Sequence, residues 1–270
     1  KDLTHTEIST DNLGTLLTLR YLPSPDTLYQ NIQRLIPGHT LTIKLENNQI
    51  QSSLKSFQPP LSEVQKLNFT DAVQLYGEKF ENAIKRQLMS DVEVGILLSG
   101  GIDSAMVAGM AQKNYSLKMK AFTIGFEGDH EEDEIKDAAE TSALFNMEHI
   151  PYKMGFKDFI QIFRECSRII EEPLATTSVI PMYFLAKKAA ENVKVVLTGQ
   201  GADEPLGGYQ RYQGEILAGK YPSFIFKPVL PTAKLLGIKK ERILRAGHSL
   251  SIGNDIDRFK AIYTVFNEKE

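Results

Sequence analysis

The sequence has little of what marks a secreted, disulfide-bonded or membrane-spanning protein. Its single cysteine, Cys166, cannot form an intramolecular disulfide or a cysteine-based zinc site, and it suits a reducing compartment. Its longest apolar runs fall far short of the roughly 20 residues that a membrane-spanning helix needs. Residues 1–10 lack the apolar core of a signal peptide, and residue 1 is Lys1 rather than methionine. We therefore expect a fragment of a cytoplasmic protein that has no membrane partner.

An excess of charge of one sign is also missing. The net charge is −3, so no overall positive field attracts nucleic acid. Hydrophobic residues make up 42% and charged residues 24% of the 270 residues, which is typical of a soluble globular protein large enough to bury a core. A small anionic substrate is compatible with this composition, because backbone donors can cradle a phosphate inside a mildly acidic protein.

The first zone, residues 1–60, predicts a short β-rich segment. Residues 41–45 alternate apolar and polar side chains, which is the period of a half-buried strand. Two asparagines at 47–48 predict a turn before a return strand, and two prolines at 59–60 predict a linker.

Residues 61–215 alternate expected helices with short apolar strands. Helices are expected at residues 70–89, 102–112, 132–145, 156–170 and 181–190, and strands at 92–98, 120–126, 149–152 and 193–197. This alternation predicts the α/β class, with a parallel sheet covered by helices on both faces. Three prolines interrupt residues 216–270, which we expect to be less regular apart from a helix at 256–266.

The most informative segment is a strand end followed by a glycine turn. It reads VGILLSGGIDSA from Val94 to Ala105. Ligands bind at the carboxyl ends of strands in an open parallel sheet, and a helix N-terminus presents free N–H groups and partial positive charge. The glycines let the backbone approach an anion closely, and the serines add hydroxyl donors. The predicted cradle, of pyrophosphate size, consists of Ser99, Gly100, Gly101 and Ser104.

Asp103 is the unusual residue in this loop. A carboxylate beside phosphates is repulsive unless a cation lies between them, so Asp103 predicts a bridging Mg²⁺. The loop is not a Walker A motif, because no Gly-Lys-Ser/Thr follows. A purely structural alternative also stands, in which this is a strand-to-helix turn and Asp103 and Ser104 only help to start the helix.

A second strand end has the same order of features. From Val195 to Glu204 the sequence reads VVLTGQGADE, an apolar strand followed by a hydroxyl, a glycine turn and carboxylates. Two such ends in one sheet can face one crevice, so Asp203 is predicted as a second metal ligand opposite Asp103. The structural alternative here is an ordinary turn with a helix-capping acid.

A third feature is the expected strand end at Ile124 and Gly125, where backbone groups are placed to read an adenine edge. The acidic run that follows, residues 129–134, is interpreted as a solvated helix start favoured by the helix dipole. His130 and Glu134 have one-turn spacing, but no third ligand accompanies them, so a zinc site is not expected.

These segments together resemble a known family. SGGIDS at 99–104 resembles the pyrophosphate-binding loop of the ATP pyrophosphatase (PP-loop) superfamily. Three further segments resemble the synthetase domain of glutamine-hydrolysing asparagine synthetases. They are FTIGF at 122–126, EEPLATTSVIP at 171–181 and LTGQGADEPLGGYQRY at 197–212. Residues 20–41 resemble the tail of that family's N-terminal glutaminase domain. The resemblance implies a Rossmann-like PP-loop domain at 61–270, incomplete at its C-terminus, after a residual glutaminase tail and linker at 1–60.

The resemblance also implies ATP and Mg²⁺ as cofactors and roles for the motif residues. Asp103 and Asp203 would bind Mg²⁺ and support catalysis, and Gln200 would contact the acceptor. The residues implied to hold the nucleotide and its pyrophosphate are Leu97, Ser99, Gly100, Gly101, Asp103, Ser104, Ile124, Thr198 and Gly199.

The implied reaction forms an amide and releases AMP and pyrophosphate. A carboxylate acceptor, aspartate or a related acid, is adenylated and then attacked by ammonia. Gln200 stands where the family usually has a glutamate suited to an α-ammonium group, so a related acceptor stays open. The family's glutaminase uses an N-terminal cysteine, whereas this chain begins with Lys1, so the expected partner is the glutaminase domain of a full-length chain. A homodimer is a further expectation.

Two other functions stay open. One is another PP-loop ligase that adenylates a different group, although no basic stripe marks an RNA substrate. The other is a nucleotide-binding module without turnover.

Overall fold

The computed structural model describes residues 7–60, 63–128, 134–170, 173, 176–235 and 241–263. The chain divides into two compact units, one of which is Gln65–Tyr209. The other unit combines Lys1–Val64 with Gln210–Glu270. The prediction of separate domains at 1–60 and 61–270 stays a prediction, and each unit is described by itself below.

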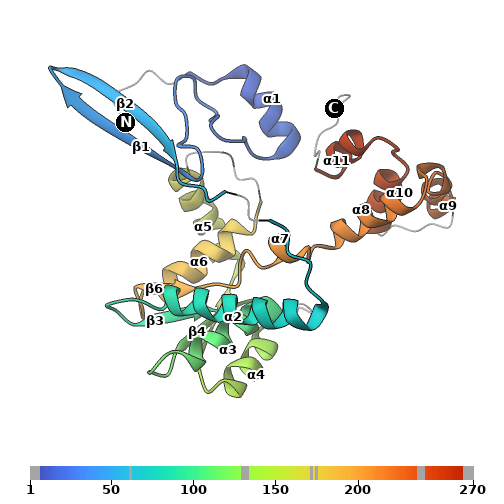
Figure 1. Ribbon diagram of the computed structural model, residues 1–270. Helices are drawn as coiled ribbons and strands as arrows, with labels where there is room; N and C mark the ends of the chain where they lie inside the picture. The colour runs from blue at the N-terminus through green and yellow to red at the C-terminus, as the bar shows by residue number, and fades with distance from the viewer. Residues whose placement is uncertain are drawn as a thin grey trace. The chain divides into compact units, whose positions relative to one another are not determined.

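The unit at 65–209 is built around a four-stranded parallel sheet (Figure 1). Its strands are β3 (Val94–Leu97), β4 (Lys120–Phe126), β5 (Glu148–Met154) and β6 (Val195–Leu197). Their order across the sheet is β5-β4-β3-β6. The chain therefore runs outward from β3 through β4 to β5 and then returns to place β6 on the other side of β3. A crevice forms outside the carboxyl ends of the strands at such a reversal of order, and ligands bind there in open α/β sheets.

Helices cover both faces of this sheet, as its alternating side chains require. Ile96 and Leu98 point to one face and pack with residues of α2 (Phe69–Gln87), α3 (Ile102–Lys113) and α4 (Ile135–Leu144). Leu97 and Phe122 point to the other face and pack against Leu185. That second face carries α5 (Phe156–Ile169) and α6 (Val179–Ala189). The predicted α/β class, with helices on both faces of a parallel sheet, is confirmed.

Element boundaries in this unit follow the expected ranges closely. The strand predicted at 120–126 has those same bounds in β4, and the helix predicted at 102–112 is α3 with one further residue. Part of the helix predicted at 132–145 lies outside the described residues, and α4 accounts for the rest. A short helix, α7 (Asp203–Leu206), follows β6 and ends at Gly207 in the left-handed conformation.

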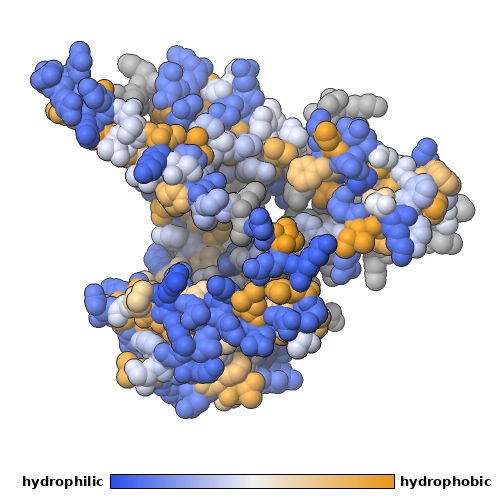
Figure 2. All heavy atoms as spheres, viewed as in Figure 1, coloured by the Kyte–Doolittle hydropathy of each residue, from blue (hydrophilic) through white to orange (hydrophobic). Residues whose placement is uncertain are grey.

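In the other unit, the N-terminal segment contains the predicted hairpin. Strands β1 (His39–Glu46) and β2 (Gln49–Ser56) pair antiparallel, which confirms the β-rich segment. Asn47 and Asn48 form its turn with φ values of 49° and 62°, a conformation that asparagine tolerates better than most residues. Hydrophobic side chains are exposed among hydrophilic ones on this hairpin, at the upper left of the space-filling view (Figure 2).

A helix that the sequence did not predict, α1 (Thr10–Leu19), precedes the hairpin. Ser9 caps it, because its hydroxyl oxygen accepts a hydrogen bond from the backbone N–H of Asn12 at 3.3 Å. Arg20 ends it in the left-handed conformation at φ 67°.

The C-terminal segment corrects the expectation of irregular structure at 216–270. Its described residues form α8 (Gln210–Lys220), the 3₁₀ turn η1 (Ser223–Ile225), α9 (Val229–Leu235), α10 (Glu241–Leu250) and α11 (Asp255–Tyr263). The prolines fit helix starts rather than breaks, because the first turn of a helix makes no use of the missing N–H. Pro222 caps η1, and Pro231 lies in the first turn of α9. The helix predicted at 256–266 corresponds to α11, and residues 264–266 of the predicted range lie outside the described residues.

Arg258 ties this helical segment together. Its side chain is 6% exposed and its guanidinium donates hydrogen bonds to Glu215 at 2.8 Å and Asp255 at 2.7 Å. Glu215 lies 43 residues earlier in the chain, so this ion pair joins α11 to α8.

Among the residues that the structure describes, no helix combines the length and the apolar character needed to span a bilayer.

Candidate functional site

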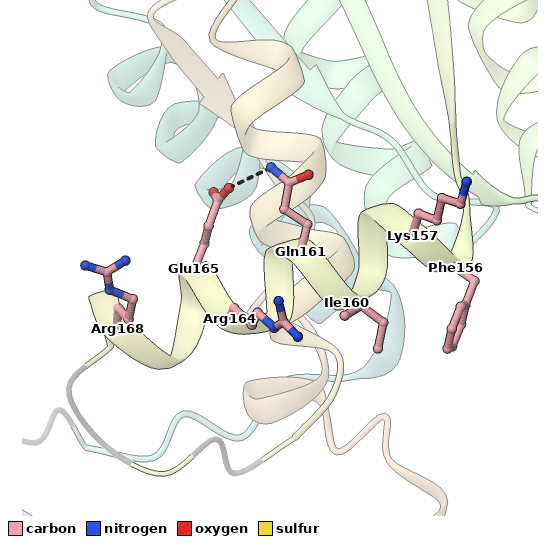
Figure 3. Close-up of a pocket in the computed structure, with 7 residues that line it drawn as sticks. All are labelled: Phe156, Lys157, Ile160, Gln161, Arg164, Glu165 and Arg168. Atoms are coloured by element: carbon pink, nitrogen blue, oxygen red, sulfur yellow. Dashed lines mark hydrogen bonds between the residues drawn. The ribbon is translucent and has the colours of Figure 1, made fainter.

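Two cavities compete as the functional site of the 65–209 unit. The larger is a groove of about 570 Å³ (Figure 3). The described residues that line it all belong to α5: Phe156, Lys157, Ile160, Gln161, Arg164, Glu165 and Arg168. Glu165 accepts hydrogen bonds from Gln161 at 3.2 Å and from Lys187 at 3.0 Å, and Lys187 and Gln161 together lower the pKa of Glu165. All these lining residues come from one helix and do not converge on a ligand from several elements, so we assign no chemistry to this groove.

The second cavity, of about 320 Å³, lies where the topology places a ligand site. It opens at the carboxyl ends of β3, β4 and β6 and is bordered by α3, α6 and the segment after β6. Its lining residues are Leu97, Leu98, Ser99, Gly101, Asp103, Ser104, Ile124, Glu134, Met182, Leu185, Thr198, Gly199, Gln200, Gly201, Asp203 and Tyr209.

The structure brings nearly all of the predicted site residues together in this one cavity. The predicted residues that line it are Leu97, Ser99, Gly101, Asp103, Ser104, Ile124, Thr198, Gly199, Gln200 and Asp203. Gly100 alone of the predicted set does not line it. The N–H of Gly100 donates instead to the carboxylate of Glu134 at 3.3 Å. The roles of these residues stay predictions, while their common location is a property of the fold.

The two serines hold the turn after β3 in shape. The hydroxyls of Ser99 and Ser104 lie 2.7 Å apart, and the Ser99 hydroxyl accepts from the N–H of Gly101 at 3.2 Å. The Ser104 hydroxyl lies 3.0 Å from the carbonyl oxygen of Gly101 and accepts from the N–H of Ser99 at 3.2 Å. Ser104 is 5% exposed, and the two hydroxyls accept hydrogen bonds from the N–H groups of Ser99 and Gly101, which orders the loop beside the cavity.

A contact between two backbones joins the second motif to the first. A Cβ on Gly199 would lie 2.6 Å from the backbone nitrogen and 2.7 Å from the Cα of Ser104, closer than real Cβ atoms approach. Glycine at 199 therefore allows the end of β6 to pack on the first turn of α3. Beyond this contact, the N–H of Gln200 donates to the hydroxyl oxygen of Thr198 at 3.2 Å, which turns the chain toward Asp203.

The charges of the cavity favour a cation held together with phosphates. Asp103, Asp203 and Glu134 line it, so an unaccompanied polyphosphate would be repelled. Among the described residues, no three His, Cys, Asp or Glu side chains form a cluster that could hold a metal ion alone. Mg²⁺ is commonly held by one or two carboxylates plus substrate phosphates. Asp103 and Asp203 both line this cavity, so they fit that manner of binding.

Several lining residues escaped the sequence reasoning: Leu98, Glu134, Met182, Leu185, Gly201 and Tyr209. Met182 and Leu185 lie on a helix that was predicted, but its pattern did not say which face meets the strand ends. Glu134 belongs to the acidic run interpreted as a solvated helix start. Tyr209 follows the Gly207-Gly208 pair, and its hydroxyl donates to Glu204 at 2.8 Å.

The single cysteine lies away from this cavity's lining residues. Cys166 is a buried thiol, 1% exposed, and burial raises the pKa of that thiol, which disfavours the reactive thiolate. His130, most of the acidic run and four residues of the 171–181 motif lie outside the described residues.

Comparison with known proteins finds one family over most of the chain. The family model described as asparagine synthase matches residues 75–260. Glutamine-hydrolysing asparagine synthetase 1 of Bacillus subtilis is 30% identical over 248 residues, covering 89% of this chain and 38% of that protein. Putative glutamine-hydrolysing asparagine synthetase 2 of Methanocaldococcus jannaschii is 32% identical over 260 residues, covering 92% of this chain and 48% of that protein. The chain thus spans less than half the length of these relatives.

A solved structure, the NH3-dependent NAD synthetase from Campylobacter jejuni, matches with a TM-score of 0.38 at 18% identity. The match covers 69% of this chain and 95% of that one. A TM-score this low adds nothing to the fold described above.

Proposed function

We propose, because this chain belongs to the asparagine synthase family, that it forms the ATP-binding part of an enzyme that makes an amide from a carboxylate and ammonia. The observation that carries the proposal is the convergence of two strand-end motifs, 99–104 and 198–203, on one cavity. The backbone contact between Gly199 and Ser104 brings them together. A shared crevice at a topological switch point is the place where α/β sheets bind nucleotides.

The cavity is lined by both apolar and polar residues, which suits the two parts of ATP. The apolar lining residues are Leu97, Leu98, Ile124, Met182 and Leu185. We assign the adenosine to these residues. The N-terminus of α3 has no side-chain cap at Gly101, and we assign the pyrophosphate to this helix end and the turn before it. When bound, Mg²⁺ would supply charge neutralisation to the phosphates, with Asp103 and Asp203 as its protein ligands.

The proposed chemistry has two steps, and this chain contributes mainly positioning to both. An oxygen of the acceptor carboxylate bonds to the α-phosphorus of ATP while the bond to the β-phosphate bridging oxygen breaks and pyrophosphate leaves. Ammonia then adds to the acyl carbon, the bond to AMP breaks, and a proton is lost to give the neutral amide. The loop at 99–104 orients the leaving pyrophosphate and stabilises its charge, and the apolar lining residues limit the access of water.

The acceptor is aspartate or a related carboxylic acid. Gln200 lines the cavity at the position implied to meet the acceptor, and its neutral amide offers an α-ammonium group less attraction than a carboxylate would. The relatives' names describe glutamine-hydrolysing enzymes, which supports a glutaminase domain of the full-length protein as the ammonia source. A homodimer, a cytoplasmic location and Mg²⁺ dependence belong to the same proposal.

The test is to identify the phosphorus products formed by the full-length protein, with this chain in parallel. The reaction contains Mg·ATP, ammonium and either L-aspartate or another acid from a panel. We expect AMP and pyrophosphate, formed only when an accepted acid is present, and the panel identifies that acid. Formation of ADP and phosphate, or no turnover with any acid while ATP is bound, contradicts the proposal. Binding without turnover favours the alternative of a nucleotide-binding module.

The paired aspartates give a sharper test of the site itself. Asp103→Asn and Asp203→Asn should each weaken Mg·ATP binding by about tenfold or more, because each removes a charged ligand without changing side-chain size. Asp91→Asn, at an exposed position of the same unit, is the matched control and should bind like the parent. Titration calorimetry measures all three. Unchanged binding by both site variants would show that the paired-carboxylate site is wrong.

A further inference from the structure

Thr123 is a buried polar residue that none of the motif roles uses. It lies in the middle of β4 and is 1% exposed. A hydroxyl at such a position is stable only when its hydrogen-bonding capacity is used. Its hydroxyl donates to the carbonyl oxygen of Leu98 at 2.8 Å. Leu98 directly precedes the loop at 99–104, so this bond ends where the loop begins.

The bond replaces regular strand pairing at the point where β3 stops. The register between β3 and β4 ends at Leu97 paired with Phe122. One residue further, the N–H of Leu98 still donates to the carbonyl oxygen of Phe122 at 2.8 Å. The carbonyl oxygen of Leu98 accepts a hydrogen bond from the hydroxyl of Thr123. Both polar backbone groups of Leu98 are thereby held by β4, while the chain beyond it turns away to form the cradle.

A second side chain fixes the orientation of the Thr123 hydroxyl. The Nε2 atom of His149, on β5, lies 3.1 Å from the Thr123 hydroxyl oxygen. Because the single hydroxyl hydrogen points to Leu98, the oxygen accepts, and His149 must carry its hydrogen on Nε2. Burial lowers the pKa of His149, which favours the neutral ring at neutral pH. The three residues form a chain of hydrogen bonds from β5 through β4 to the residue directly after β3.

We infer that Thr123 is a positioning residue for the phosphate-binding loop, held in place by His149 and acting through the carbonyl of Leu98. This inference rests on the proposed function, namely that the loop at 99–104 binds the phosphates of ATP. Thr123 itself does not line the cavity, so its effect on the ligand is indirect. Its removal should loosen the loop and reduce pyrophosphate binding more than adenosine binding.

The experiment compares Thr123→Val with Thr123→Ser. Valine has nearly the shape of threonine but cannot donate to Leu98, whereas serine restores the hydroxyl. We expect Thr123→Val to weaken binding of Mg·pyrophosphate about tenfold and to leave adenosine binding within about twofold, while Thr123→Ser restores most of the pyrophosphate affinity. Amide hydrogen exchange at 99–101 should accelerate in the valine variant alone. Calorimetry and mass spectrometry of the folded protein provide the readouts.

Ser142→Ala is the matched control for a lost buried hydroxyl. Ser142 is 1% exposed in the same unit, and among the described residues its hydroxyl has no hydrogen-bond partner. This variant should bind pyrophosphate like the parent. Equal pyrophosphate affinity in the parent and Thr123→Val overturns the inference, as does an equal loss of both ligands. A parent that binds neither Mg·pyrophosphate nor Mg·ATP overturns the proposed function instead.

Discussion

The two sheets of this protein use the same kinds of side chain in opposite environments. All four residues of β3 are buried, and Ile96 in its middle is fully inaccessible to solvent. In the hairpin, every residue of β2 is exposed, and Ile43 of β1 is 63% exposed. Leu41 pairs with Leu54 and Leu45 with Ile50, so these aliphatic pairs share one face of the hairpin.

The two sheets show which structures form from local sequence and which need packing between distant segments. The hairpin owes its form to its asparagine turn and its register, which are local features. The parallel sheet joins strands that are distant in sequence, and its stability comes from helices packed on both faces. Equal substitutions in the two sheets should therefore have very unequal effects.

The largest expected difference is between Ile96→Ala and Ile43→Ala. Truncation at the fully buried position should lower the free energy of unfolding by about 2–5 kcal/mol, because it removes buried contacts and leaves a cavity. The same change at the exposed position should alter it by less than about 0.5 kcal/mol. Urea denaturation of both variants measures the difference. Similar losses would mean that the exposed face of the hairpin is buried in solution.

The second comparison concerns glycines at the edge of the buried sheet and on a helix surface. Gly199→Ala should destabilise the fold by about 1–3 kcal/mol and weaken Mg·ATP binding, because the new methyl group would collide with the backbone of Ser104. Gly77→Ala, in α2 with no atom within 4 Å of the new methyl group, should stabilise by about 0.5–1 kcal/mol. Thermal melting and calorimetry distinguish the two. A harmless Gly199→Ala would contradict the close contact between β6 and α3.

A smaller effect is expected at Glu134, whose carboxylate accepts a hydrogen bond from the N–H of Gly100 in the turn after β3. Glu134→Gln removes a negative charge from that anion-binding turn. It should tighten the binding of metal-free pyrophosphate by about fivefold, which corresponds to roughly 1 kcal/mol. Glu140→Gln, at an exposed position of α4, which begins directly after Glu134, is the control and should leave the affinity unchanged. Weaker binding by the Glu134 variant would indicate that this carboxylate assists the ligand.

The smallest effect is the pH dependence contributed by His149. Burial lowers the pKa of His149 in the folded state, so the unfolded state binds a proton more readily. The stability that this residue contributes is complete above the unfolded pKa of about 6.5 and is lost as the pH falls through the lower folded value. His149→Gln should flatten the decline of urea midpoints between about pH 7 and pH 5. A decline of the same steepness in the parent and His149→Gln would contradict this contribution.

Strong local patterns allowed the sheet and much of the cavity to be predicted. The segment of β4 is mainly apolar, apart from Lys120 and Thr123, and has the predicted bounds. The motifs that begin at 99 and 198 lie where parallel strands end. Prediction failed where tertiary contacts decide. The segment of α1 is rich in threonine and contains Gly14, so its local propensity for a helix is weak. Prolines at helix starts in the C-terminal segment looked like breaks.

The same distinction explains the unpredicted residues of the cavity. Glu134 reaches the turn after β3 only because α4 begins beside it, a contact between positions 34 residues apart. The contact of Gly199 with Ser104 is likewise invisible in either motif alone. Residue types predicted which chemistry is available, while the packing of helices determined which side chains take part in it.

The order of strands in the parallel sheet also has a consequence for how the chain folds. Residues of β3 pair with residues of β6 that lie roughly 100 positions later, so this pairing closes the longest loop in the sheet. Contacts of such high sequence separation form slowly, and during synthesis they must wait until the later strand has left the ribosome. The proposed nucleotide site is therefore complete only after one late event, the docking of β6. Ligand binding by a nascent chain would report that this event has occurred.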